Sequence, residues 1–99
     1  MKWIETMIVR SAKALPRGLC REWVRNLLRE ERVPRPETVK VYRNDPLETD
    51  LKITLQWDSE RCPPGGSPPA RHLLHVLKEH GLVSYRLWVE EDVENGMGR

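Results

Sequence analysis

The segment that begins at residue 17 carries a row of arginines at a regular spacing. The row recurs every four residues and consists of Arg17, Arg21, Arg25 and Arg29. Side chains four residues apart on an α-helix lie on one face, so these residues are candidates for binding phosphates or an acidic surface. Three glutamates dilute the charge, and the chain has neither a phenylalanine nor the RNP1 pattern of RNA-binding sheets. We therefore expect a solvated face rather than a nucleic-acid site.

Three histidines, His72, His75 and His80, fall within nine residues. His72 and His75 are three residues apart, which places them on one helical face, and Cys62 lies ten residues upstream of His72. These side chains are potential zinc ligands, but no Cys-x-x-Cys or His-Glu-x-x-His motif accompanies them. We therefore expect no metal site, and no motif in the chain indicates a cofactor.

A glycine-rich loop, residues 64–67 (PGGS), leads into a helix that has Arg71 in its first turn. Free N–H groups at a helix N-terminus bind anions, so the loop is a candidate anion cradle. It is not a P-loop, because the Gly-Lys-Ser/Thr ending is missing. A turn followed by a helix cap at Ser67 explains the same residues, and we favour that interpretation.

Four strands and two helices must position these residues. Alternating or β-branched apolar residues predict strands at 3–9, 38–43, 51–57 and 82–90. A stripe of apolar residues predicts one helix from Arg17 to about Glu31, ended by the prolines that follow. A second helix begins at Pro68, with Ser67 as its N-cap.

The resulting order is β-α-β-β-α-β. Right-handed crossovers would place both helices on one face of a four-stranded antiparallel sheet. The sequence therefore predicts a single α+β domain of the ferredoxin-like kind over residues 1–91. Residues 92–99 are acidic and contain glycine, and we expect a flexible tail there.

The face assigned to the first strand decides what the sheet leaves open. We place Ile4, Thr6 and Ile8 toward the helices. The apolar side chains then left on the open face are Trp3, Met7, Val9, Tyr42 and Trp88. Monomers rarely expose so large an apolar patch, so we expect a second copy to cover it in a homodimer, sheet against sheet.

The same face offers a candidate small-molecule pocket. Its members are Trp3, Tyr42, Arg86 and Trp88. Aromatic side chains with a few polar groups are typical of ligand pockets. We also expect Glu5 to pair with Arg86 on this face, either as part of a functional site or to fix the dimer register.

Three segments, WIETMIVRS, LKITLQWDSE and GLVSYRLWVEE, resemble the dimeric α/β-barrel superfamily, which includes antibiotic-biosynthesis-type monooxygenases and many small bacterial proteins of unknown role. The resemblance covers about residues 2–91 and rests on element order and scattered aromatics. It implies sheets paired face to face and a ligand space between sheet and helices. Members include cofactor-free oxygenases, haem-degrading enzymes and proteins with no known activity. No catalytic motif of theirs matches residues of this chain.

The leading hypothesis from the sequence is a homodimer of the dimeric α/β-barrel type that binds a ligand or has a structural role, without catalysis. One alternative is a cofactor-free monooxygenase or isomerase. Another is a nucleic-acid or acidic-protein binding module that uses the arginine row, which fits the charge of +6 on residues 1–44 against −4 on residues 45–99. The 99 residues contain no apolar run of membrane-spanning length and no export signal, so we expect a cytoplasmic protein with free thiols at Cys20 and Cys62.

Overall fold

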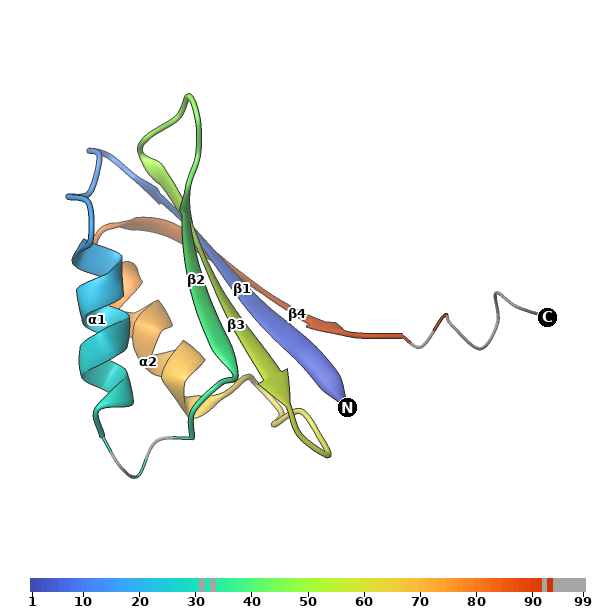
Figure 1. The fold of residues 1–99 in the computed structure, drawn as a ribbon. Helices are drawn as coiled ribbons and strands as arrows, with labels where there is room; N and C mark the ends of the chain where they lie inside the picture. The colour runs from blue at the N-terminus through green and yellow to red at the C-terminus, as the bar shows by residue number, and fades with distance from the viewer. Residues whose placement is uncertain (31, 33, 92, 94–99) are drawn as a thin grey trace.

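The computed structural model describes residues 1–30, 32, 34–91 and 93. Its elements, in chain order, are β1 (Lys2–Ser11), α1 (Leu19–Leu28), β2 (Thr38–Arg43), β3 (Asp50–Asp58), α2 (Pro68–Leu77) and β4 (Gly81–Val89). The strands form one antiparallel sheet in the order β2-β3-β1-β4, and both helices lie on one side of it (Figure 1). This confirms the predicted ferredoxin-like βαββαβ fold.

Neither helix in the described ranges is long and apolar enough to cross a membrane. The predicted tail at 92–99 lies outside the described residues, apart from Val93.

Both helices are short, and α1 is shorter than predicted. It begins after its N-cap Gly18, which adopts a left-handed backbone conformation with a φ of 85°, and it ends at Leu28. Arg17 therefore precedes the helix and Arg29 is its C-cap. α2 begins as predicted, because the Ser67 hydroxyl accepts a hydrogen bond from the Ala70 amide at 3.2 Å.

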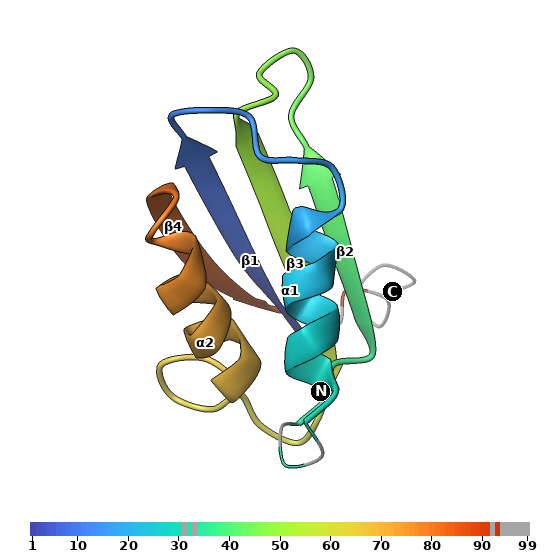
Figure 2. The ribbon, with the colours of Figure 1, turned by 90° about the vertical axis from the view of Figure 1, so that its left-hand side faces the viewer.

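The core lies between the helices and the sheet. α1 covers the β2 side of the sheet and α2 covers the β4 side (Figure 2). Among the apolar side chains with less than 2% of their surface exposed are Met7, Ile53, Leu55, Leu73 and Leu77. The predicted alternation of β3 is confirmed, since its inward positions are buried from Leu51 to Trp57.

The face predicted for β1 is wrong. Trp3, Glu5, Met7 and Val9 are buried under the helices, whereas Ile8 is 39% exposed on the opposite face. Apolar residues occupy both alternating sets of this strand, so alternation alone does not choose between them. The pairing of β1 with β3 determines which set is buried. It places Trp3 opposite Trp57, and their indoles stack with centroids 5.2 Å apart.

Candidate anion-binding site

Two adjacent hollows run between α1 and the edge strand β2. They have volumes of about 210 and 470 Å³ and share Arg21 and Val41 in their walls. Together they are lined by six arginines: Arg17, Arg21, Arg25, Arg29, Arg35 and Arg43. We call this feature the arginine groove. All four arginines of the predicted row contribute to it, and Arg35 and Arg43 join them from the α1–β2 connection and from β2.

The arginine groove holds positive charge that no described carboxylate in its walls neutralises. No aspartate or glutamate lines either hollow within the described part of the chain. The ion pairs in the described part of the chain join the N-terminus to Asp58 and Arg10 to Asp50. They therefore involve none of the six arginines. A concave surface of one sign concentrates the field and attracts ions of the other sign.

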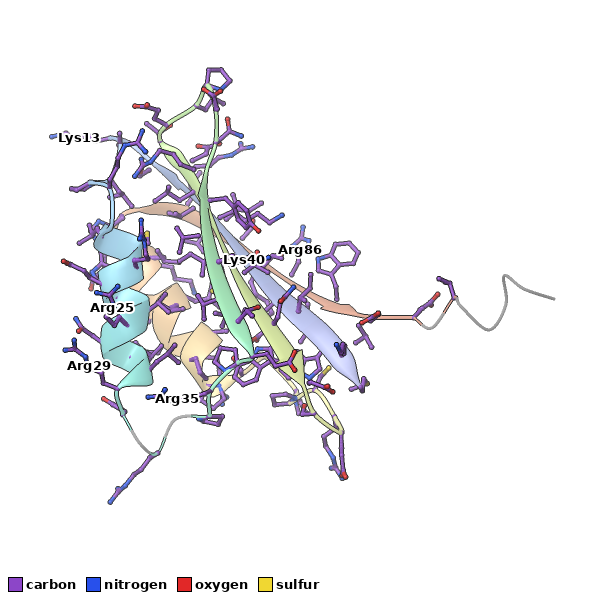
Figure 3. The ribbon with its side chains drawn as sticks, viewed as in Figure 1. Lys13, Arg25, Arg29, Arg35, Lys40 and Arg86 are labelled. Atoms are coloured by element: carbon purple, nitrogen blue, oxygen red, sulfur yellow. The ribbon has the colours of Figure 1, made fainter. Side chains whose placement is uncertain are left out.

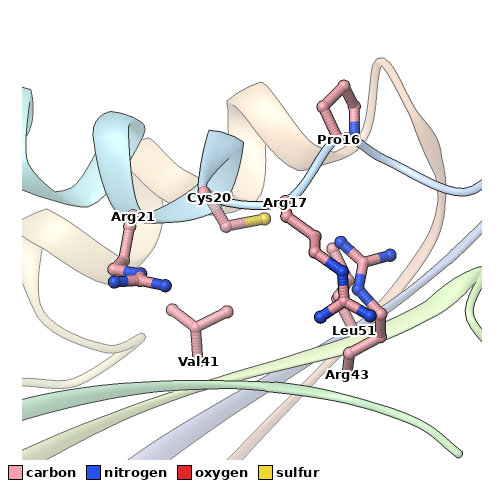
Figure 4. A pocket seen from close by; sticks show the side chains of 8 residues that line it. Pro16, Arg17, Cys20, Arg21, Val41, Arg43 and Leu51 are labelled. Atoms are coloured by element: carbon pink, nitrogen blue, oxygen red, sulfur yellow. The ribbon is translucent and has the colours of Figure 1, made fainter.

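Arg43 is held in place at one end of the groove. Its guanidinium donates to the carbonyl of Glu48 at 2.8 Å and to the carbonyl of Leu15 at 2.7 Å. Both acceptors are neutral, so Arg43 is oriented by hydrogen bonds and forms no ion pair with a described residue. Arg17 points toward the same guanidinium (Figure 4). Both guanidinium groups carry a positive charge and line the same hollow, so an anion bound there would be attracted by both.

Among the described residues, the groove is lined by no side chain suited to acid–base or nucleophilic chemistry at neutral pH. Arginine stays protonated at any physiological pH. Cys20 lines the smaller hollow, and burial raises the pKa of its thiol, an effect that the charge of Arg43 partly offsets. A thiol that stays protonated at neutral pH is a poor nucleophile. The arrangement is therefore suited to holding an anion.

The four pocket candidates from the sequence do not form one pocket. Trp3 is 3% exposed on the helix side of the sheet, whereas Tyr42 and Trp88 are 47% and 59% exposed on the other face, on opposite edge strands. Trp3 and Trp88 line a hollow of about 400 Å³ at one end of the sheet, and Tyr42 lines a different one of about 440 Å³. Arg86 lines neither.

Glu5 is the most unexpected residue of the fold, because its carboxylate is fully buried. It accepts four hydrogen bonds, from the Trp57 indole at 2.7 Å, the Tyr85 hydroxyl at 2.6 Å, and the Ser67 amide and hydroxyl at 2.8 and 2.6 Å. Each carboxylate oxygen accepts two of them. We call Glu5, Trp57, Ser67 and Tyr85 the Glu5 cluster. The predicted Glu5–Arg86 pair is wrong, since Arg86 lies on the opposite face of the sheet.

The Glu5 cluster also accounts for the glycine-rich loop. Ser67 caps α2, and its amide and hydroxyl both donate to Glu5. The anion at this helix N-terminus is therefore supplied by the chain itself. An acidic residue in the apolar strand β1 was the available sequence signal, because a buried carboxylate requires several donors.

Tyr85 makes the Glu5 cluster sensitive to alkaline pH. Burial, followed by the hydrogen bond to Glu5 and the negative charge of Glu5, raises the pKa of Tyr85 above its usual value of about 10. The folded state then keeps a proton that the unfolded state loses. This stabilisation is fully present below about pH 10 and is lost as the pH rises through the folded-state pKa.

We expect the urea midpoint of the wild-type protein to fall more steeply above pH 10 than that of Tyr85→Phe. The measurement is urea unfolding followed by far-ultraviolet circular dichroism between pH 7 and 11. Tyr42→Phe is the matched control, because Tyr42 is exposed and should leave the slope unchanged. Equal slopes for the wild type and Tyr85→Phe would contradict the prediction.

The histidines and Cys62 do not form a ligand set. Among the residues that the structure places, no group of three histidine, cysteine, aspartate or glutamate side chains is arranged to hold a metal ion. His80 instead packs against Trp23, with ring centroids 4.9 Å apart. Burial and the charge of Glu5 raise the pKa of the Cys62 thiol.

Comparisons with known proteins do not identify a family for this chain. No protein-family model and no curated protein match the sequence. A solved structure, a formyltetrahydrofolate deformylase from Pseudomonas putida KT2440, is similar with a TM-score of 0.49 and 16% identity. The match covers 91% of this chain but 29% of the deformylase, and it says nothing about function. The resemblance to the dimeric α/β-barrel superfamily holds at the level of the ferredoxin-like fold, and no finding supports a closer link to monooxygenases.

Proposed function

We propose that this chain is an anion-binding domain whose ligand presents phosphate groups to the arginine groove. The observation that supports the proposal is the set of six arginines lining one groove where the described residues place no carboxylate. A guanidinium binds phosphate oxygens through two parallel N–H donors, and several such groups in a row suit a ligand with several phosphates.

The length of the groove favours a ligand longer than one phosphate. Arg21 and Arg29 are eight residues apart, which corresponds to about 12 Å along a helix. Arg17 and Arg43 extend the groove beyond Arg21. A single phosphate would contact only one end, whereas a polyphosphate or a phosphate-bearing polymer would contact most of it.

As expected from the sequence, the proposed function is ligand binding without catalysis, but the proposed site is the arginine groove instead of the open face of the sheet. The proposal also revises the expectation that the arginine row is merely solvated. The homodimer stays a prediction. The apolar patch on the open face is smaller than expected, because Trp3, Met7 and Val9 are buried in the core. No feature of the described residues favours the oxygenase or isomerase alternative.

Tripolyphosphate binding tests the proposal. We expect isothermal titration calorimetry to show binding to the wild type that weakens as salt is added. Arg17→Gln/Arg21→Gln should lower the affinity by about tenfold or more, because each charge-assisted hydrogen bond to phosphate is strong. Arg61→Gln/Arg71→Gln is the matched control, since it removes the same charge from exposed positions outside the groove.

The two double variants separate a site from a general charge effect. A loss confined to Arg17→Gln/Arg21→Gln supports the groove as the site. An equal loss in both variants, or no binding by the wild type, would show that the proposed function is wrong.

A further inference from the structure

The open face, which is the side of the sheet away from the helices, carries a second basic surface. Its three central rows follow from the strand register and read Thr38–Gln56–Ile4–Trp88, Lys40–Thr54–Thr6–Arg86 and Tyr42–Lys52–Ile8–Ser84. These twelve positions include three exposed cations, Lys40, Lys52 and Arg86, and no carboxylate. The remaining side chains are hydroxyl, amide, aromatic or aliphatic groups.

Charge complementarity identifies the kind of partner that fits this face. A second copy laid sheet against sheet would bring the cations of one copy toward those of the other, which costs free energy. An anionic partner would instead be attracted by Lys40, Lys52 and Arg86 together. Figure 3 shows Lys40 and Arg86 on this side of the molecule, whereas Arg25 and Arg29 lie on the helix side.

Two exposed aromatic side chains lie at opposite corners of the same surface. Tyr42 is on edge strand β2 and Trp88 on edge strand β4, three strand spacings apart, which is about 14 Å. Their rows are separated by four residues along the strands, about 13 Å. A chain that touches both rings must therefore span roughly 20 Å, and it would cross the three cations on the way.

Each ring also adjoins a hollow that could receive a flat group. The hollow beside Trp88 has a volume of about 400 Å³ and includes Glu37 and Glu90 in its walls. The hollow beside Tyr42 has a volume of about 440 Å³ and includes Asp45 and Asp50. Carboxylates accept hydrogen bonds from the exocyclic amino groups of bases, so acidic rims next to an aromatic ring fit a nucleobase.

We propose that the open face binds single-stranded nucleic acid, with bases stacked on Tyr42 and Trp88 and phosphates over Lys40, Lys52 and Arg86. Bases in a single strand expose the flat faces that such stacking requires, and a backbone-tracking cationic surface with aromatic platforms is how sequence-tolerant binding is achieved. A paired duplex hides those faces. The surface is distinct from the arginine groove, so the inference does not depend on the proposed function.

Fluorescence anisotropy with a fluorescein-labelled deoxycytidine decamer, whose bases carry an exocyclic amino group, tests the inference on the full chain. We expect Lys40→Gln/Lys52→Gln/Arg86→Gln to lower the affinity by about twentyfold or more. The slope of log affinity against log salt should become less negative by about 2, since each lost phosphate contact contributes about 0.7. Arg61→Gln/Arg71→Gln/Lys78→Gln removes the same charge from exposed positions elsewhere and is the control.

The aromatic side chains provide an independent test. Tyr42→Ala and Trp88→Ala should each lower decamer affinity by between about 5-fold and 150-fold, the range for losing one stacked base. Trp88→Phe keeps a stacking ring and should retain most of the affinity. Leu47→Ala, at an exposed apolar position in the loop before β3, is the control.

The results distinguish this inference from the proposed function. If the open-face variants lose the decamer but keep wild-type affinity for tripolyphosphate, the two sites are separate and the inference holds. Unchanged decamer affinity in the open-face variants would overturn it and leave the arginine groove standing. Equal affinity for a ten-base-pair duplex, or equal competition by polyglutamate, would also overturn it, because neither ligand offers unstacked bases.

Discussion

Replacing Glu5 by alanine is expected to cost about 4 kcal/mol or more of the free energy of unfolding. The substitution leaves the indole of Trp57, the hydroxyl of Tyr85 and both donors of Ser67 without their acceptor. Each buried donor left unpaired costs about 1–3 kcal/mol. For a chain of 99 residues the expected loss corresponds to a fall in Tm of at least about 16 °C.

Urea unfolding followed by far-ultraviolet circular dichroism measures the effect. Glu60→Ala is the control, because Glu60 is exposed and has no partner among the described side chains. Glu5→Gln should give an intermediate loss, since its carbonyl can still accept two bonds while its NH₂ faces two donors. This variant keeps the prediction testable if Glu5→Ala does not fold. A stability of Glu5→Ala within about 1 kcal/mol of Glu60→Ala would contradict a stabilising role for the cluster.

The sequence predicted the elements well where one periodic pattern excluded the others. β3 alternates without interruption between Leu51 and Trp57, so only one of its faces can be buried. Ser67 followed by Pro68 marks the start of α2 unambiguously, because a serine cap and a proline at the first position satisfy the same helix end. Six elements in this order then leave few topologies for a short chain.

The orientation of β1 could not be predicted, because its determinants are distant in the sequence. The donors to Glu5 are 52, 62 and 80 residues away from it. A glutamate in a strand is normally a sign of the solvated face, whereas Glu5 is buried on the helix side. Only the folded structure brings Trp57, Ser67 and Tyr85 to one point, where burial of the carboxylate becomes favourable.

The sequence indicated part of the arginine groove. The four-residue spacing predicted that Arg17, Arg21, Arg25 and Arg29 share one helical face. All four line the arginine groove, although Arg17 precedes α1 and Arg29 is its C-cap. The spacing did not indicate that this face borders the edge of the sheet, where β2 forms the other wall of the groove. Arg35 and Arg43 were missed for the same reason, since they belong to other segments and follow no shared period.

The groove and the open face lie on either side of β2, whereas the Glu5 cluster joins β1, β3, β4 and the start of α2. Substitutions in the cluster should therefore change stability, and substitutions on the two basic surfaces should change binding. This separation allows the proposals on binding to be tested with variants that keep the core intact.

Gly66→Ala is expected to destabilise the fold by about 3 kcal/mol, which combines about 1–2 kcal/mol for the backbone with a steric cost of similar size. Gly66 has a φ of +94°, which residues with a Cβ adopt only with strain. A Cβ there would lie 2.7 Å from the Tyr85 hydroxyl oxygen and 3.1 Å from a Glu5 carboxylate oxygen. Both atoms are fixed by their mutual hydrogen bond, so neither can move away freely.

Gly65→Ala is an unusually close control for this prediction. Gly65 precedes Gly66 and has a φ of +77°, but nothing lies within 4 Å of the Cβ that would be added. It should therefore show the backbone cost alone, and the difference between the two variants in urea unfolding measures the contact with Tyr85 and Glu5. Combining Gly66→Ala with Tyr85→Phe removes the nearest atom and should cost less than the sum of the two single substitutions. Equal losses for Gly65→Ala and Gly66→Ala would mean that the cluster yields to the added methyl group, and that Glu5 is held less rigidly than its four hydrogen bonds imply.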